Sequence, residues 1–393
     1  MLVLQGMLLI DGSGKEPIEN ALVVVEEDKI KAVGRVGEID TSGAAEAIDL
    51  TGKTLLPGLI DCHVHICMDP VSDPFASLVK DSDATTTLKA ARKALQTLKA
   101  GVTTIRDMGG KNHIDLDLRD AIAQGLAQGP RIMASGRLIT MTGGHGWMIG
   151  REVDGPDEAR KGAREEIKAG VDVIKIMATG GVMTPGVEPG SPQLTEEEMR
   201  AAVEEAKKAG KITASHAQGL TGIKNAIRAG IDSIEHGIYL DEEACEMMIE
   251  NNVYLVPTLA APYWIVTKGR EAGIPDYAVS KTEKVIETHN ASFRLALKMG
   301  VKIAMGTDSG TPFNEHGENT YELKLMVQEG MTPMQAIVAA TKNGAELLGL
   351  SDQIGTVEAG KQADLLVVDG NPLEDIDAVT RVHLVFKGGK AVS

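Results

Sequence analysis

Cysteine is scarce in this chain of 393 residues, which has Cys62, Cys67 and Cys245 and no others. The number is odd, and the spacings do not match a zinc knuckle. Cys62 and Cys67 flank a pair of histidines, but Cys62 alternates away from that pair if the segment is a strand. We therefore expect three buried or inactive thiols in a reducing compartment, the cytoplasm.

Long apolar runs and an excess of basic residues are also missing. No segment approaches the length of a membrane span, and the start MLVLQGMLLIDGSG lacks the basic residues and cleavage site of a signal peptide, so we expect a strand there. The formal net charge is −16 and is spread along the chain. Such a surface repels nucleic acid and anionic membranes, so neither is an expected partner.

What the chain does contain, across residues 56–354, is an alternation of strand-like and helix-like segments. The strand-like runs are GLIDCHVHI, GVTTIRDMGG, PRIMASGRLIT, VDVIKIMATGG, KITASHAQG, IDSIEHGIYL, NVYLVPTLA and VKIAMGTDSG. Strands that alternate with helices predict a parallel sheet in an α/β protein, and eight of them predict a (β/α)8 TIM barrel. An open doubly wound sheet is the alternative, but no GxGxxG motif follows an early strand.

Helix signals support this alternation. The run 83–100 has apolar residues at helical spacing, and the run 194–209 opens with Thr195 as a plausible N-cap and Glu198 at the capping-box position. The motifs KAG and RAG recur where helices are expected to end, as a glycine C-cap would. The run 260–280 is the longest irregular stretch, and we interpret it as a possible lid.

The two ends of the chain have a different texture from the middle. Residues 1–55 and 355–393 contain short β-branched runs separated by glycine and aspartate, such as NALVVVEEDKI and DLLVVDG. Since chain ends tend to lie close together, we expect both ends to form one small β-sandwich domain beside the barrel of residues 56–354.

The motif GLIDCHVHI places His63 and His65 two residues apart at the end of an apolar run. Residues at this spacing share one face of a strand, so both imidazoles can bind one metal ion. The motif alone is weak, because a lone histidine at a strand end is more often a hydrogen-bonded core residue. It gains weight because other strand-like runs end in similar side chains.

In a (β/α)8 barrel the carboxyl ends of all strands meet at one face, where active sites lie. Imidazoles and a carboxylate suit zinc or a similar divalent ion. Lys175 is ambiguous by itself: it can be a lysine that extends its ammonium group to solvent, or a deprotonated amine that reacts with carbon dioxide to give a carbamate. The predicted metal-site residues are His63, His65, Lys175, His216, His236 and Asp308.

Six motifs, GLIDCHVH, VDVIKIMATGG, ASHAQG, SIEHGIYLD, GTDSG and GTVEAGKQADLLVVDG, resemble the amidohydrolase superfamily along essentially the whole chain. The similar branch is the imidazolonepropionase-related one, which includes Xaa-Pro dipeptidases and Xaa-Arg carboxypeptidase-like enzymes. The resemblance implies a barrel with two metal ions, zinc by expectation, and a β-sandwich from both chain ends. The resemblance also implies that the protein forms homo-oligomers.

Carried over by motif, the resemblance assigns His63, His65 and Asp308 to the more buried metal. It assigns His216 and His236 to the second metal, with carboxylated Lys175 as the bridge. This set separates the chain from imidazolonepropionase itself, which is expected to use one metal and no bridging lysine. Asp308 is the expected proton acceptor for the attacking hydroxide and donor to the leaving amine.

Two further residues are catalytic candidates. His145, in the Gly-rich motif TGGHGW, is expected to polarise the substrate carbonyl or hold a carboxylate, and Tyr239 is expected to donate a hydrogen bond to the oxyanion or a carboxylate. Arg106 and Asp107 are interpreted as a structural ion pair or loop anchor, and His316 is a weak candidate. The remaining histidines, His113, His289 and His383, are expected away from the site.

The leading functional hypothesis is hydrolysis of an amide or peptide bond in a small substrate, a dipeptide such as Xaa-Pro or an N-acyl amino acid. Hydrolysis of a cyclic amide, as in imidazolonepropionase, is the second hypothesis. A metal-free scaffold or binding protein is the third, and the complete set of candidate ligands argues against it.

Overall fold

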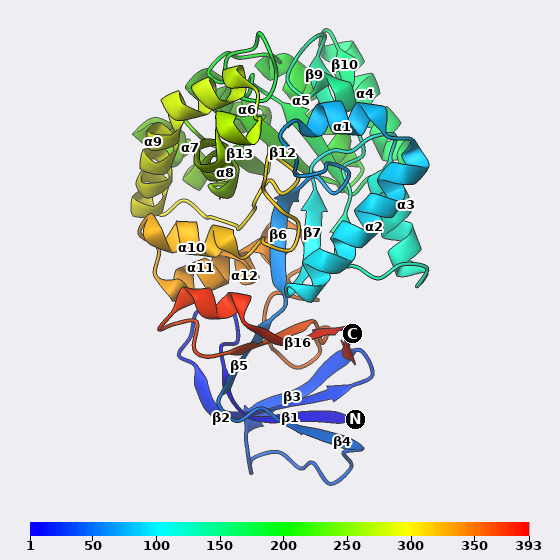
Figure 1. Ribbon diagram of the computed structural model, residues 1–393, viewed down its shortest axis with the longest axis vertical. Coiled ribbons are helices and arrows are strands. Elements are labelled where there is room, and N and C mark those ends of the chain that lie inside the picture. Colours follow the sequence, from blue (N-terminus) through cyan, green and yellow to red (C-terminus); the bar gives the residue numbers. More distant parts are fainter. Residues whose placement is uncertain (393) are drawn as a thin grey trace.

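The computed structural model describes residues 1–392 and shows two structurally distinct parts. The lower part in Figure 1 is a mixed sheet built from both ends of the chain, and the upper part contains parallel strands surrounded by helices. Strand β6 (Leu59–Val64) leads from the first part into the second. The predicted α/β class with parallel strands is therefore confirmed.

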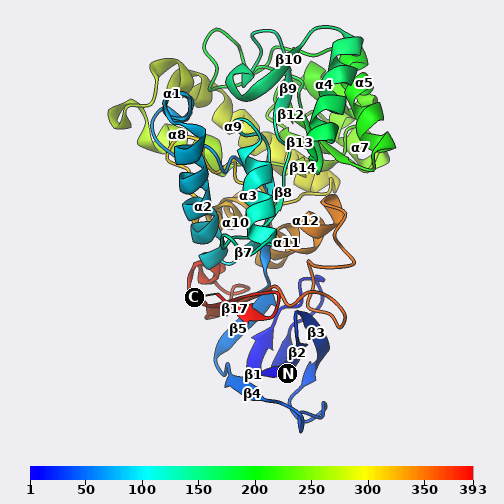
Figure 2. The same cartoon turned by 90° about the vertical axis from the view of Figure 1, so that its right-hand side faces the viewer.

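The mixed sheet has the strand order β17-β16-β15-β5-β1-β2-β3, and β4 pairs with β1. Buried side chains that include Leu4, Val23, Leu55, Val367 and Phe386 form one hydrophobic cluster on it. In Figure 2 these strands lie below the helical part. Their bounds are β1 (Leu2–Leu9), β2 (Ile18–Glu26), β3 (Lys29–Arg35), β4 (Glu46–Asp49), β5 (Lys53–Pro57), β15 (Leu365–Asp369), β16 (Val382–Lys387) and β17 (Lys390–Ala391).

The other strands form two parallel sheets, one ordered β6-β7-β8 and the other β10-β9-β11-β12-β13-β14. Nearly every residue of β7, β11 and β12 is buried, as expected for parallel strands with both faces covered. Their bounds are β7 (Val102–Asp107), β8 (Arg131–Met133), β9 (Leu138–Met141), β10 (Gly150–Val153), β11 (Val173–Met177), β12 (Ile212–Ala217), β13 (Ser233–His236) and β14 (Tyr254–Val256).

Helices follow most of the parallel strands and surround them in both views (Figures 1 and 2). Their bounds are α1 (Pro74–Lys80), α2 (Asp83–Lys99), α3 (Ile114–Ala123), α4 (Pro156–Ala169), α5 (Glu196–Lys208), α6 (Leu220–Ala229), α7 (Glu242–Glu250), α8 (Ala260–Lys268), α9 (Asp276–Met299), α10 (Tyr321–Gln328), α11 (Pro333–Ala339) and α12 (Lys342–Leu347), with short 3-10 turns η1 (Trp147–Ile149), η2 (Arg270–Ala272) and η3 (Ile376–Thr380). None of these described helices combines the length and apolar character needed to cross a membrane.

Local sequence signals explain where several helices begin and end. The Thr195 side chain accepts from the backbone N–H of Glu198 and the Glu198 side chain accepts from that of Thr195, which is the predicted capping box of α5. Gly170 and Gly230 end α4 and α6 in the left-handed conformation that glycine adopts without strain.

Three expectations about the strands and loops were wrong. The run PRIMASGRLIT is not one strand, because Gly136 adopts φ +63° and separates β8 from β9. The run VKIAMGTDSG forms isolated bridges, Leu255 with Ile303 and Val64 with Ser309, instead of a regular strand. Residues 260–280 are mostly helical, because they contain α8 and the start of α9.

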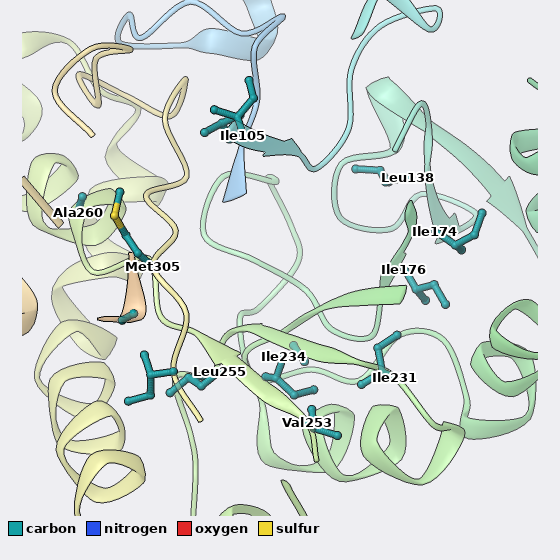
Figure 3. Close-up of a cluster of buried hydrophobic side chains, with 14 of the residues drawn as sticks. Ile105, Leu138, Ile174, Ile176, Ile231, Ile234, Val253, Leu255, Ala260 and Met305 are labelled. Atoms are coloured by element: carbon teal, nitrogen blue, oxygen red, sulfur yellow. The ribbon is translucent and has the colours of Figure 1, made fainter. Parts of the chain in front are cut away.

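The core of the helical part lies between the parallel strands and the helices. Ile105, Ile174, Ile234, Leu255 and Met305 belong to one buried cluster, and Figure 3 shows how side chains from these separate strands and loops contribute to it. Burial of apolar surface in such contacts stabilises each strand, by about 25 cal/mol per Å² of apolar surface buried. This anchoring holds the polar side chains at the strand ends in place.

Candidate active site

The structure brings all six predicted metal-site residues to one pocket at the carboxyl ends of the parallel strands. His145 also lines the pocket. The rest of the wall is largely apolar. The lining includes the polar residues His63, His65, His145, Lys175, His216, Gln218, His236, Thr258, His289, Asp308 and Thr311 and the apolar residues Met68, Phe75, Leu138, Ile149, Met177, Val182, Met183, Ile238, Ile265 and Val285.

His63, His65 and Asp308 form a tight cluster. The Nε2 atoms of His63 and His65 lie 3.4 and 3.3 Å from Oδ1 of Asp308. One ligand atom from each residue lies within 4.8 Å of the others, as required for a shared metal ion. The backbone couples them further, because the N–H of Asp308 donates to the carbonyl of His63 over 2.7 Å.

His216 and His236 lie beside this cluster. Their ring centroids are 4.6 Å apart, and the His236 ring is 5.1 Å from that of His63. The Nε2 of His216 lies 2.9 Å from the carbonyl of Gly180, and Nδ1 of His236 lies 2.7 Å from Oγ1 of Thr258. These contacts orient both rings in the pocket.

Two of these residues have a left-handed backbone. His236 has φ +72° and Asp308 has φ +59°, and a non-glycine residue in this region is unfavourable unless its surroundings hold it there. The contacts that hold His236 include a hydrogen bond to its carbonyl from Nε2 of His289, 2.9 Å away. Both residues thus combine an unfavourable backbone conformation with a side chain that lines the pocket.

Burial and mutual repulsion keep most of these imidazoles neutral. Burial, followed by the fields of neighbouring cationic groups, lowers the pKa of His63, His216 and His236 well below the usual value. Burial alone would also lower the pKa of His65, but its hydrogen bond to Asp308 and the field of that carboxylate raise it. Neutral imidazole is the form that binds metal, so this donor set fits a divalent cation.

Lys175 lies on β11 and is 2% exposed. Burial lowers the pKa of Lys175 to about 8, although the carboxylates of Glu235 and Asp308 oppose this shift. Its amine is therefore much easier to deprotonate than that of a lysine in water. The residue does not reach solvent, so the interpretation as a solvent-directed lysine does not fit the structure.

Glu235 was not among the predicted site residues. This carboxylate, 0% exposed, lies 2.8 Å from Nδ1 of His63 and accepts from Arg106 over 2.8 Å and from Oγ of Ser233 over 2.5 Å. Glu235 precedes His236 in the chain. An acidic residue inside a buried strand was the sequence feature that could have identified Glu235 as a site residue. Metal-binding histidines commonly donate a hydrogen bond from the N–H of their second ring nitrogen to such a carboxylate.

Arg106 is a buried structural residue, as expected, but its ion-pair partner differs from the one anticipated. It pairs with Glu235 and also donates to the carbonyl of Cys62 over 2.6 Å. Asp107 instead accepts from the backbone N–H groups of Ile66 and Gly109, over 2.6 and 3.1 Å. Arg106 therefore contacts both the backbone of β6 and the Glu235 carboxylate behind His63.

His145 lines the same pocket, beside His216. Its ring centroid is 4.4 Å from that of His216, and its Nδ1 lies 2.7 Å from Oγ1 of Thr184. Burial, followed by the field of Lys175, lowers the pKa of His145 to about 3. Its ring is thus a neutral group held from behind by Thr184.

Other candidates are placed differently. Tyr239 is half-buried and is not among the described residues that line the pocket, so its catalytic role stays a prediction. His289 was expected away from the site, but it lines the pocket because α9 packs against the end of β13; that expectation was wrong. His316 is buried outside the described lining, His113 contacts Glu166, and His383 is exposed.

The cysteines are free and buried, as expected. Burial raises the pKa of Cys62 to about 12 and that of Cys245 to about 11, so both are protonated, unreactive thiols near neutral pH.

The fold and the cluster of imidazoles define a hydrolase of the amidohydrolase type, and the comparisons with known proteins agree. The amidohydrolase family model matches residues 54–392, and the chain belongs to this family. This confirms the superfamily and branch indicated by the sequence motifs.

Ochratoxinase from Aspergillus niger is 33% identical over 416 residues, covering 98% of this chain and 85% of that protein. Imidazolonepropionase from Fusobacterium nucleatum is 26% identical, covering 96% and 92%. The crystal structure of a Xaa-Pro dipeptidase with bound methionine in the active site is 37% identical with a TM-score of 0.92, and 99% of each chain is covered.

Proposed function

We propose that this protein hydrolyses an amide or peptide bond in a small substrate, either a dipeptide such as Xaa-Pro or an N-acyl amino acid, and that two divalent ions, zinc by preference, are its cofactors. The observation that carries the proposal is the convergence of five imidazole and carboxylate side chains and a buried lysine in one pocket. The similarity to a Xaa-Pro dipeptidase and to ochratoxinase supports amide substrates.

In this proposal His63, His65 and Asp308 hold one ion, and His216 and His236 hold the other. Carboxylated Lys175 bridges them. The buried position of the lysine and its lowered pKa favour the neutral amine that carbon dioxide requires. When bound, the two ions supply an acidified water and polarise the substrate carbonyl.

The chain's own residues then have distinct tasks. Asp308 accepts the proton of the attacking water and returns it to the leaving amine. His145, held by Thr184, contacts the substrate oxygen on which negative charge develops. The apolar wall of the pocket excludes bulk water around the reacting atoms.

We further propose that the parallel strands close into a (β/α)8 barrel of residues 56–354. Two links across the gaps support closure. The N–H of Asp172 donates to the carbonyl of Ala134, between the two parallel sheets, and residues 302–309 hydrogen bond both β14 and β6. Residues 1–55 and 355–393 then form a β-sandwich domain, and we retain homo-oligomerisation and a cytoplasmic location as proposals.

The test combines metal analysis with a substrate screen. The purified protein, supplied with zinc and bicarbonate, is expected to bind two zinc ions per chain and to cleave dipeptides or N-acyl amino acids. Lys175→Ala is expected to lose bound metal as well as turnover, whereas the exposed-site control Lys284→Ala keeps both. A Lys175→Ala protein with two bound ions and normal turnover would refute the bridging role.

The similarity to imidazolonepropionase keeps a cyclic-amide substrate as a second candidate. Comparing turnover of dipeptides with that of imidazolone or hydantoin rings separates the two. Failure to bind any metal would instead support the third hypothesis, a metal-free binding protein.

A further inference from the structure

Two side chains in the pocket each have a buried polar atom without a hydrogen-bond partner within residues 1–392. The atoms are Oε1 of Gln218 and the ring nitrogen Nδ1 of His289. The residues are 5% and 1% exposed. A buried polar atom without a partner is unfavourable and rare in native proteins. Inside a ligand pocket, such atoms indicate hydrogen bonds that the ligand completes.

Both residues lie against the same short segment, 236–239. Gln218 follows β12 two residues after His216, and its backbone carbonyl accepts from the N–H of Tyr239 over 3.0 Å. His289, on α9, contacts the carbonyl of His236 through Nε2 over 2.9 Å. Both residues line the pocket and contact the segment that carries the predicted metal ligand His236, Gln218 through its backbone and His289 through its ring.

The hydrogen bond of His289 to the His236 carbonyl indicates which ring nitrogen carries the proton. A carbonyl oxygen only accepts hydrogen bonds, so Nε2 must donate and carries the ring proton. In a neutral imidazole this leaves Nδ1 as an acceptor with a free lone pair. Gln218 adds a second acceptor, and its carboxamide can also donate. These acceptors are thus suited to an N–H group on the ligand.

The charge of the pocket favours a neutral N–H over an ammonium group. Asp308 is the one carboxylate among the described lining residues, and it belongs to the predicted metal site. Elsewhere the wall is apolar, with Leu138, Ile149, Ile265 and Val285 among its side chains. A buried ammonium needs a counter-charge, which Gln218 and His289 do not supply, whereas neutral acceptors fully pair an uncharged N–H.

We propose that Gln218 and His289 form an acceptor subsite for an uncharged N–H group of the substrate. This inference rests on the proposed function and narrows its substrate class. Preferred substrates are amides with an apolar side chain and a neutral N–H, either next to the scissile carbonyl or in the scissile amide itself. N-capped compounds are then better substrates than dipeptides with a free ammonium group.

Four proline or alanine amides test the subsite. 4-Methylpentanoyl-L-proline has no amide N–H, N-acetyl-L-leucyl-L-proline has one on the acyl side, and 4-methylpentanoyl-L-alanine has one at the scissile bond. L-Leucyl-L-proline carries an ammonium group. We expect kcat/KM for at least one N–H substrate to exceed that for 4-methylpentanoyl-L-proline by about 10- to 100-fold, and N-acetyl-L-leucyl-L-proline to exceed L-leucyl-L-proline.

The variants remove the acceptors with little change in shape. Gln218→Met is similar in length but cannot form the hydrogen bonds, and His289→Gln keeps a donor for the His236 carbonyl while removing Nδ1. In each variant the ratio of kcat/KM for N–H substrates to kcat/KM for 4-methylpentanoyl-L-proline is expected to shrink toward 1. Gln128→Met, at an exposed position outside the described lining, is the control and keeps the full preference.

Equal slowing of all four substrates in both variants would overturn the subsite. A separate measurement does not depend on turnover: nitrogen-15 NMR of histidine-labelled protein is expected to show His289 protonated at Nε2 and bare at Nδ1. A ring proton on Nδ1 would refute the acceptor role. If the enzyme cleaves none of the four compounds, the proposed function fails, and the tautomer still decides the acceptor assignment.

Discussion

Replacing Glu235 by Gln tests whether a carboxylate behind His63 tunes metal binding. The substitution keeps the size of the side chain but removes its charge, so Arg106 loses its buried counter-ion. Removing one partner of a buried ion pair costs about 3–5 kcal/mol. Because Gln still accepts one hydrogen bond, we expect the lower end, about 3 kcal/mol of unfolding free energy.

The effect on metal affinity comes from the other contact. Nδ1 of His63 faces Oε2 of Glu235 at 2.8 Å, and a neutral amide polarises that imidazole less than a carboxylate does. Loss of a carboxylate behind a metal-binding histidine typically costs 10- to 100-fold in affinity. We therefore expect zinc affinity to fall by about that factor, measured by competition with a chromophoric chelator, and stability to be measured by urea unfolding of the metal-free protein.

Glu166 provides a closely matched control. It is also buried, lies 2.7 Å from Nε2 of His113 and accepts from Arg137 over 2.9 Å, but none of these three residues is in the described pocket lining. Glu166→Gln is expected to lower stability while leaving zinc affinity within about twofold of wild type. If Glu235→Gln also leaves zinc affinity unchanged, the carboxylate merely supports the fold, and the reasoning is wrong.

Two further predictions concern stability. Burial, followed by the field of Asp107, raises the pKa of Asp115 to about 7, so the folded state retains a proton that the unfolded chain loses near pH 4. Between pH 4 and pH 7 the unfolding free energy of the wild type should therefore fall by up to about 4 kcal/mol relative to that of Asp115→Asn, measured by urea titrations at several pH values. Parallel pH profiles of the two proteins would contradict this. Thr195→Ala removes the α5 capping box and should cost about 1 kcal/mol by thermal or urea unfolding, whereas Thr195→Ser should restore most of it; equal stabilities would show that the cap contributes little.

Repeating local patterns made much of the fold predictable. The capping box at Thr195 and the glycine after α4 act within a few residues, so the sequence alone locates these helix ends. The break between β8 and β9 was harder to predict. It depends on the left-handed backbone of Gly136, and glycine is also found inside ordinary strands. The apolar residues Ile303, Ala304 and Met305 led to the prediction of a strand over residues 302–309, but this segment forms only isolated bridges.

The parts of the site that follow from the repeating strand order could be predicted, and those that depend on packing between distant elements could not. His63 and His216 lie near the carboxyl ends of β6 and β12, where the repeating architecture itself brings side chains together, so their position in the chain was informative. His289 lies in the middle of α9 and reaches the pocket only because that helix packs against the end of β13.

Glu235 was hidden for a related reason. It neighbours His236 in the chain, yet its partner is His63, which lies on a strand that is not adjacent in the sheet order. Contacts of this kind follow from how the strands are arranged around the pocket. Residues such as Glu235 and His289, which contact the predicted metal ligands, therefore follow from packing, whereas those expected to hold the metal can be predicted from the order of the strands.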